Sequence, residues 1–396
     1  MSSNVVINWG MGADSSAILA RIMTEDIARA ELGVEDDYSN LIVLTAQVGH
    51  EYGETQRLGE TYLLPMMAER GIRLVQVARA GKSLRDGYVV LDDSREPTQL
   101  HTAGVFTLGD EMLAGGTVPQ VRPFSRTCSQ KFKGEPLDRW LKAEFDGAPF
   151  VQVMGFNAEE QNRADRDDSY SGSERGLNRS TRYSLIEWGW TRKMLEDYLE
   201  AMFGEPWAKS CCTFCPFQAT VEGRPEVLAR IRRQPSAAAE ALFIETCSTA
   251  LNPLQPLFAW RGTGALGFFE TAEGGEADEA FELLAEQLES STWAVYRARR
   301  VVWTSVNSKG RKQKNGRRNL SIVAEGSEAE VLSRLMSLAV LMGGQVEQDE
   351  RGHRRVWVER RDSEAQATRE ECYVIAPKAA IEKTGNGFAK KWEEAA

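Results

Sequence analysis

The N-terminal two-thirds of the chain alternates between short apolar runs and longer stretches with helical spacing. Apolar residues recur at helical intervals over residues 17–23 and 56–70. Short runs rich in β-branched residues are typical of buried strands in a parallel sheet, and they cover residues 5–9, 41–46, 72–77 and 150–155. The pattern predicts an α/β domain with a mostly parallel sheet. Residues 79–120 are rich in Gly, Asp and Thr, and we expect them to form an irregular lid or surface loop.

The last hundred residues follow another pattern. An acidic, helix-prone segment at 266–292 is expected to link two domains, covering residues 1–265 and 293–396. The second domain should be a small α+β module with two hairpins and one helix. Its expected elements are a strand at 293–306, a basic turn at 309–318, a strand at 319–323, a helix at 331–342 and a hairpin at 346–359 that turns at 350–352.

Composition is typical of a globular protein, with 396 residues, 42% hydrophobic and 27% charged. The chain has no apolar run near 18 residues and no N-terminal signal segment, so we expect a cytoplasmic protein without a membrane partner. The net charge of -10 argues against nucleic-acid binding over the whole surface. It leaves room for a local basic patch.

A glycine turn joins the first expected strand to the first expected helix. It reads Gly10-Met11-Gly12-Ala13-Asp14-Ser15-Ser16. The two glycines let the backbone approach a ligand closely, and the two serines add hydroxyl donors. Because the free N–H groups and the positive dipole end of the helix face the turn, the stretch favours phosphate. It is neither a Walker loop nor a dinucleotide fingerprint, and an ordinary turn capped by Asp14 is the other interpretation.

Polar side chains also follow two other expected strands. The second strand ends in Gly49, Glu51 and Glu54, at the edge where ligands bind in open α/β folds. Arg163 follows the strand at 150–155 and can grip a phosphate in a bidentate fork. A solvated helix start with favourable acids remains an alternative for the first group.

Two segments carry most of the cysteine chemistry. Residues 122–137 surround Cys128 with cations, among them Lys133, which favours a thiolate and can also hold phosphates. Cys212-x-x-Cys215 adds two thiols, and Cys211 offers a fourth. An iron–sulfur cluster, a zinc site and a redox pair all fit this pattern. Cys128 could also be a buried thiol beside a basic helix start.

Taken in order, these motifs resemble the PP-loop ATP pyrophosphatases and their relatives, the phosphoadenylyl- and adenylyl-sulfate reductases. The glycine turn is similar to Ser-Gly-Gly-x-Asp-Ser-Ser, with Gly10 in place of the first Ser and Met11 in place of a Gly. The other matches are Gly49, Glu51, Glu54 and Thr55; Cys128, Lys133, Pro136 and Leu137; Glu159, Glu160 and Arg163; and a helix entry at 183–191 before a helix at 192–203. The resemblance covers residues 1–260, and the C-x-x-C pair resembles the subset that binds a cluster.

The resemblance implies an adenine nucleotide α-hydrolase-like, Rossmann-like fold for the first domain. It also implies that a substrate oxygen attacks the α-phosphorus of ATP with Mg²⁺, that pyrophosphate leaves, and that sulfur then displaces AMP. The implied catalytic residues are Asp14, Ser15, Lys133 and Arg163. The implied nucleotide-binding residues are Gly10, Gly12, Ser15, Ser16, Gly49, Glu51 and Glu54, and the implied ligands of a [4Fe–4S] cluster are Cys128, Cys211, Cys212 and Cys215.

Two features of the C-terminal third indicate which class of substrate to expect. The reductases carry a mobile Glu-Cys-Gly-x-His tail, whereas here Cys372 has no Gly-x-His after it. Residues 290–324 contain no acid, and the cations between 297 and 318 suggest a nucleic-acid partner. A solvated turn explains the same cations. We therefore expect DNA phosphorothioation, with a sulfur donor such as a cysteine desulfurase. tRNA thiolation, reduction of adenylyl sulfate or phosphoadenylyl sulfate (PAPS), and a non-catalytic nucleotide-binding role are the alternatives.

Overall fold

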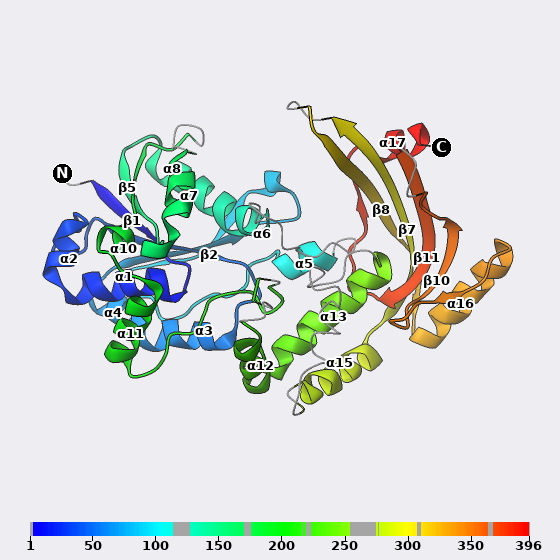
Figure 1. Ribbon diagram of the computed structural model, residues 1–396, viewed down its shortest axis with the longest axis horizontal. Coiled ribbons are helices and arrows are strands. Elements are labelled where there is room, and N and C mark those ends of the chain that lie inside the picture. The colour runs from blue at the N-terminus through cyan, green and yellow to red at the C-terminus, as the bar shows by residue number, and fades with distance from the viewer. Residues whose placement is uncertain are drawn as a thin grey trace. The chain divides into compact units, whose positions relative to one another are not determined.

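The computed structural model describes residues 3–113, 127–169, 176–215, 217–218, 223–253, 275, 277–306, 310–362 and 367–395 (Figure 1). The chain divides into two compact units. The first comprises Met1–Leu108 and Pro123–Thr213, and the second comprises Gly109–Arg122 and Phe214–Ala396. From the sequence we expected the first domain to reach residue 265, whereas the segment after Thr213 clusters with the second unit.

The first unit is built on a six-stranded sheet in the order β4-β3-β2-β1-β5-β6. Its strands are β1 (Asn4–Asn8), β2 (Leu41–Gln47), β3 (Arg73–Arg79), β4 (Tyr88–Ser94), β5 (Phe150–Val153) and β6 (Arg179–Arg182). All neighbours are parallel except β3 and β4. β2 is buried along its whole length, as a central parallel strand should be. The predicted α/β class with a mostly parallel sheet is confirmed.

Helices cover both faces of this sheet. α1 (Ala13–Thr24) and α11 (Arg192–Phe203) pack with Val5 and Ile7 of β1. α7 (Glu135–Phe145) packs on the opposite face, with Val6 of β1. Successive side chains of a strand point to opposite faces, so β1 contributes to both layers. The other helical elements of this unit are α2 (Asp26–Glu31), α3 (Gly53–Leu58), η1 (Gly59–Leu63), α4 (Leu64–Glu69), η2 (Leu84–Asp86), α6 (Thr127–Ser129), η3 (Gln130–Gly134), η4 (Ala158–Glu160), α8 (Gln161–Ser169) and α10 (Ser184–Glu187).

The prediction of irregular structure over residues 79–120 was wrong for part of that range. It contains η2, the strand β4 and the helix α5 (Leu108–Leu113), while residues 114–120 lie outside the described residues. β4 is an edge strand whose residues are half-buried or exposed, so it lacks the apolar run that marked the buried strands. The helix predicted at 56–70 is confirmed, with a π-helical turn between its α3 and α4 parts.

The second unit contains a six-stranded antiparallel sheet in the order β12-β8-β7-β11-β10-β9. Its strands are β7 (Trp293–Val306), β8 (Lys312–Gly326), β9 (Glu347–Gln348), β10 (Arg354–Glu359), β11 (Ala367–Pro377) and β12 (Lys383–Thr384). Both predicted hairpins are present, as β7–β8 and β9–β10. The bounds predicted for the first were wrong, because β8 begins at Lys312 and residues 312–318, expected as a basic turn, pair with β7 as strand. β11 lies between β7 and β10 in this sheet and was not predicted.

Two helices sandwich this second sheet. α13 (Pro235–Leu251) packs on one face, against Tyr296 and Val374, and α16 (Glu328–Leu341) packs on the other, against Val295 and Val356. α16 confirms the helix predicted at 331–342. The remaining helices are α12 (Arg224–Arg233), α15 (Asp278–Ser290) and α17 (Phe388–Glu394). Among the described residues, no helix has both the length and the apolar character needed to span a membrane.

Candidate functional site

A cavity of about 380 Å³ lies at the carboxyl ends of β1 and β5 in the first unit. The strand order reverses at this point, because β2 lies on one side of β1 and β5 on the other. Connections that leave toward opposite faces create a crevice there, where ligands bind in open α/β sheets. The expected site residues that line the cavity are Gly10, Gly12, Asp14, Ser15, Lys133 and Arg163. Its volume falls within the roughly 300–1,000 Å³ typical of small-ligand sites.

The glycine turn forms one wall of the cavity. Met11 sits in the left-handed region with φ 60°, and α1 starts directly after Gly12. No side chain caps this helix, so the N–H groups of its first three residues lack partners within the helix. A Cβ atom at Gly155 would lie 3.0 Å from the backbone N of Ser15. The missing side chain at the end of β5 therefore leaves this N–H group uncovered.

The hydroxyl groups of the two serines in the turn already have partners within the protein. Ser15 Oγ accepts a hydrogen bond from the Gly10 N–H at 3.1 Å and so braces the turn. Ser16 is fully buried, and its Oγ accepts a hydrogen bond from Trp9 Nε1 at 3.0 Å. Ser16 does not line the cavity, so its hydroxyl holds the turn to the sheet instead of facing a ligand.

Asp14 is held by two residues that sequence reasoning missed. Its carboxylate accepts from Asn157 Nδ2 at 2.9 Å and pairs with Arg192 at 2.6 Å. Asn157 follows β5, and Arg192 begins α11. Burial lowers the pKa of Arg192, but the carboxylates of Asp14 and Glu196 outweigh it and raise that pKa above its ordinary value. Asp14 therefore ties the start of α1 to two distant segments.

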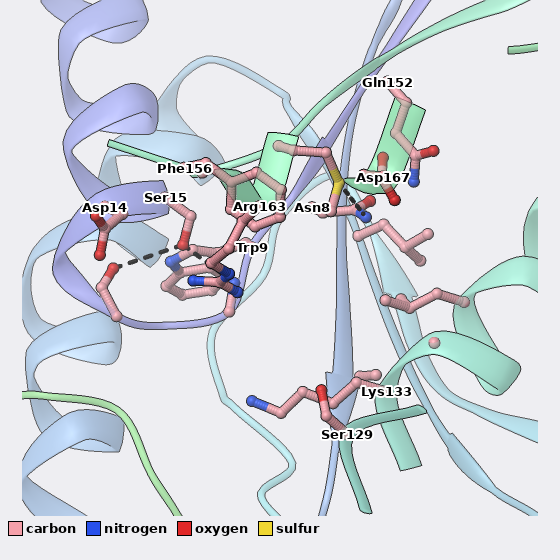
Figure 2. A pocket seen from close by; sticks show the side chains of 18 of the residues that line it. Asn8, Trp9, Asp14, Ser15, Ser129, Lys133, Gln152, Phe156, Arg163 and Asp167 are labelled. Carbon is pink, nitrogen blue, oxygen red and sulfur yellow. Dashed lines mark hydrogen bonds between the residues drawn. The ribbon is translucent and has the colours of Figure 1, made fainter. Parts of the chain in front are cut away.

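Of the two predicted cations that line the cavity, one has an ion-pair partner and the other has none among the described residues. The half-buried Lys133 makes no hydrogen bond or ion pair with any residue that the structure describes. Arg163 instead forms an ion pair with Glu160 and stacks over the Phe156 ring, 4.4 Å from its centroid. Figure 2 shows Lys133 reaching into the cavity from η3, below the side on which Asp14 and Ser15 lie. Lys133 is thus the cation most available to an anion here.

The other end of the cavity carries a second polar group that sequence reasoning missed. The side chain of Arg179 is buried, donates to Gln152 Oε1 at 2.5 Å and pairs with Asp167 at 3.1 Å. Gln152 and Asp167 lie together at the upper right of Figure 2, away from Asp14. On β1, Asn8 donates to Met154 Sδ, while its buried Oδ1 has no donor among the described residues. These side chains come from β1, β5, β6 and α8, so no local motif joins them.

The segment from Trp207 to Cys212, which leads into the C-x-x-C pair, is joined to the glycine turn by a series of contacts. Trp207 Nε1 donates to Met11 O at 3.0 Å, and Ser210 Oγ donates to Gly10 O at 2.8 Å. Glu51 Oε1 accepts from the Cys211 N–H at 2.7 Å, and its Oε2 accepts from Ser210 at 3.1 Å. Cys212 forms an isolated antiparallel bridge with Glu51. The strand end after β2 thus holds the cysteine segment beside the turn.

The residues predicted after β2 do not line the cavity. Gly49 has φ 103°, and a Cβ there would lie 2.4 Å from Thr107, so this position requires glycine for local backbone reasons. Glu51 acts through the cysteine segment as described above, and Glu54 lies in the first turn of α3. These residues follow β2 as expected, and Glu51 is linked to the glycine turn through the cysteine segment.

All six cysteines are free thiols. Among the described residues, no group of three or more His, Cys, Asp or Glu side chains is placed to hold a metal ion. Cys128, Cys211 and Cys212 belong to the first unit and Cys215 to the second, so a cluster held by these four thiols stays a prediction. Other cations predicted near Cys128, at residues 122 and 126, lie outside the described residues.

The chain was compared with protein-family models, curated proteins and solved structures, and none of the three comparisons found a match. The interpretation of the cavity therefore rests on its own residues and geometry.

Proposed function

We propose that the first unit is a PP-loop ATP pyrophosphatase that converts ATP to AMP and pyrophosphate. The observation that carries this proposal is the cavity itself, which joins uncapped N–H groups of α1 to the unpaired Lys133. Backbone N–H groups at a helix start and a nearby ammonium are a recurrent combination for phosphate binding. We assign the fold of this unit to the adenine nucleotide α-hydrolase-like, Rossmann-like class on the same grounds.

The protein groups would act by positioning and charge compensation. The N–H groups of the first turn of α1 and the ammonium of Lys133 would hold the phosphates, while bound Mg²⁺ would neutralise charge on the departing pyrophosphate. Asp14 would keep Arg192 and Asn157 in place at the edge of the site. The orphaned Oδ1 of Asn8 would accept from a ligand donor such as the amino group of adenine, since a buried acceptor without a donor is costly.

We also propose sulfur insertion into a nucleic acid, most specifically DNA phosphorothioation, supplied by a donor such as a cysteine desulfurase. The contacts that join Cys211 to the glycine turn support sulfur chemistry close to the nucleotide. Adenylyl-sulfate reduction is less well supported, because Cys372 is buried in β11 and burial raises its pKa to about 11. A reductase tail needs an exposed, mobile thiol. tRNA thiolation uses the same adenylation and remains the second candidate.

A [4Fe–4S] cluster is a separate part of the proposal, and the cleavage of ATP described above does not require it. The four thiols named for it are not arranged as a metal-binding group in the described residues. Iron analysis of protein purified without air tests this directly. The proposal expects iron in the wild type and its loss in Cys212→Ser, whereas a colourless, iron-free wild type would remove the cluster from the proposal.

Product analysis tests the reaction. The full chain is incubated with ATP and Mg²⁺, with and without duplex DNA and a sulfur donor, and nucleotides are separated by ion exchange. We expect AMP and pyrophosphate in equal amounts. Asp14→Ala should lower the rate by about tenfold or more, since Arg192 and Asn157 lose their common acceptor. Asp197→Ala, on the same helix as Arg192 but outside the cavity, is the matched control. ADP and phosphate as products would exclude the proposed mechanism.

A further inference from the structure

The basic hairpin of the second unit presents its cations on two different faces. β7 and β8 pair in antiparallel register from Val306↔Lys312 to Tyr296↔Ile322 without a break. Side chains alternate along each strand, so Lys312, Lys314 and Arg318 share one face of β8, and Arg317 points to the other. Figure 1 shows this pair extending as one long ribbon. The cations of this hairpin therefore form two groups, one on each face of the strand pair.

On the face of Arg317 the cations already have protein partners. Arg297 pairs with Glu371 at 2.6 Å, and Arg299 donates to Asn319 Oδ1 at 2.8 Å. Arg317 donates to the Asn386 carbonyl at 3.0 Å and lies over the Trp303 ring. Arg299 also lies over the Phe388 and Trp392 rings of α17, so the cations of this face are engaged by the protein itself.

The opposite face is different. Lys312 and Lys314 are exposed and make no hydrogen bond or ion pair with any described residue. Arg318 lies directly across from Arg300, and like charges at directly opposed positions destabilise a strand pair. Arg300 is compensated by Glu370 at 2.6 Å, whereas the Arg318 side chain makes no hydrogen bond or ion pair with any residue that the structure describes. Burial and the charge of Arg300 lower the pKa of Arg318, and the opposing effect of the Glu111 carboxylate does not outweigh them. An external anion would relieve this repulsion.

A glycine lies in the middle of the same row, between Lys314 and Arg318. A Cβ atom at Gly316 would meet the Val301 carbonyl at 3.6 Å and Val302 Cγ2 at 3.9 Å, which are ordinary contacts. Its φ does not lie in the left-handed region, so the fold itself does not demand glycine here. Glycine weakens a strand interior and often marks a place where another backbone approaches closely. The absence of a side chain at Gly316 therefore supports the close approach of a partner independently of the charges.

We propose that Lys312, Lys314 and Arg318, with Gly316 between them, form a contact surface for the phosphate backbone of a nucleic acid. Alternate residues of a strand are roughly 6.8 Å apart, twice the rise of about 3.4 Å per residue, which resembles the spacing of successive phosphates. The inference rests on the proposed function only in taking the substrate to be a nucleic acid. It goes further by assigning the contact to one face of β8.

Salt-dependent binding of a fluorescent 20-base-pair duplex to the full chain tests this assignment. The double variant Lys312→Ala/Lys314→Ala should flatten the log–log salt slope by about 1.8, at about 0.9 per lost contact. Arg317→Ala, a cation on the other face of the same strand, should leave the slope near that of the wild type. Gly316→Ala should weaken binding severalfold while leaving resistance to urea unchanged or higher, because the fold accepts the methyl group.

Three results would overturn the inference. The first is a double variant that binds like the wild type, and the second is an equal loss in Arg317→Ala. The third is binding to vesicles with anionic headgroups when neither duplex DNA nor tRNA binds at low salt. ATP cleavage is measured on the same samples. AMP formation without DNA binding would refute this surface alone, and DNA binding without AMP formation would refute the proposed reaction alone.

Discussion

Met11 offers a sharp test of the glycine turn, because two opposing effects act on one residue. Its backbone is left-handed with φ 60°, which costs an L-residue about 1–2 kcal/mol. Its side chain is only 2% exposed, and replacing a buried Met by Ala costs about 2–5 kcal/mol. The burial term is larger, so both Met11→Ala and Met11→Gly should destabilise the protein although glycine relieves the backbone strain.

The comparison of the two variants isolates the free-energy cost of the left-handed backbone at position 11. Both lose the buried side chain, but only glycine adopts the left-handed region without a Cβ penalty. Met11→Gly should therefore be about 1 kcal/mol more stable than Met11→Ala. At ordinary helical positions the order is reversed, since glycine is less stable than alanine by about 1 kcal/mol. Ala20→Gly within α1 is the matched control for that ordinary order.

Urea denaturation of the full chain measures this difference, with the transition midpoints of all four proteins compared under one condition. The wild type should be the most stable, followed by Met11→Gly and then Met11→Ala. If Met11→Ala were as stable as Met11→Gly, Met11 would not be left-handed in solution. The conformation described for the glycine turn would then be wrong.

Two further variants test the surroundings of the site. Gly155→Ala should weaken pyrophosphate binding by about tenfold, because the added methyl group would lie 3.0 Å from the Ser15 backbone nitrogen and crowd the N–H group that faces the ligand; unchanged affinity in calorimetry would contradict this. Glu205 accepts hydrogen bonds from Arg57 and Tyr62, which lower its pKa to about 2 from 4.5. A carboxylate whose pKa is lowered in the folded state stabilises the fold at pH values above its unfolded pKa. The stability advantage of the wild type over Glu205→Gln should therefore be full above about pH 4.5 and vanish as pH falls to about 2. An advantage that grows toward low pH in urea melts would refute the assignment.

Local pattern predicted much of the first sheet, whereas the partners of the site residues depended on long-range contacts. β1, β2, β3 and β5 were visible because buried parallel strands are continuous apolar runs. Arg192 and Trp207 could not be found in this way. They meet Asp14 and Met11 across 178 and 196 residues of sequence.

β11 shows why a strand of the second sheet was missed. Its first half contains Arg369, Glu370 and Glu371, which read as an exposed segment. In the structure Glu370 and Glu371 are buried, and they pair with Arg300 and Arg297 of β7. Charged side chains that pair across neighbouring strands conceal the apolar alternation that identifies strands. The same ion pairs neutralise Arg297 and Arg300, so these two cations of the hairpin are not available to an external anion.

Calorimetric titration of the full chain with pyrophosphate tests the central claim that the cavity is a phosphate site built on the glycine turn and Lys133. The wild type should bind pyrophosphate in the presence of Mg²⁺. Lys133→Ala should bind it about ten- to a hundredfold more weakly, since a charged hydrogen bond contributes about 1.5–3 kcal/mol. Lys131→Ala, on the same π-helical turn but outside the cavity, should retain the wild-type affinity. Equal affinities in all three proteins, or no binding by the wild type, would contradict the account.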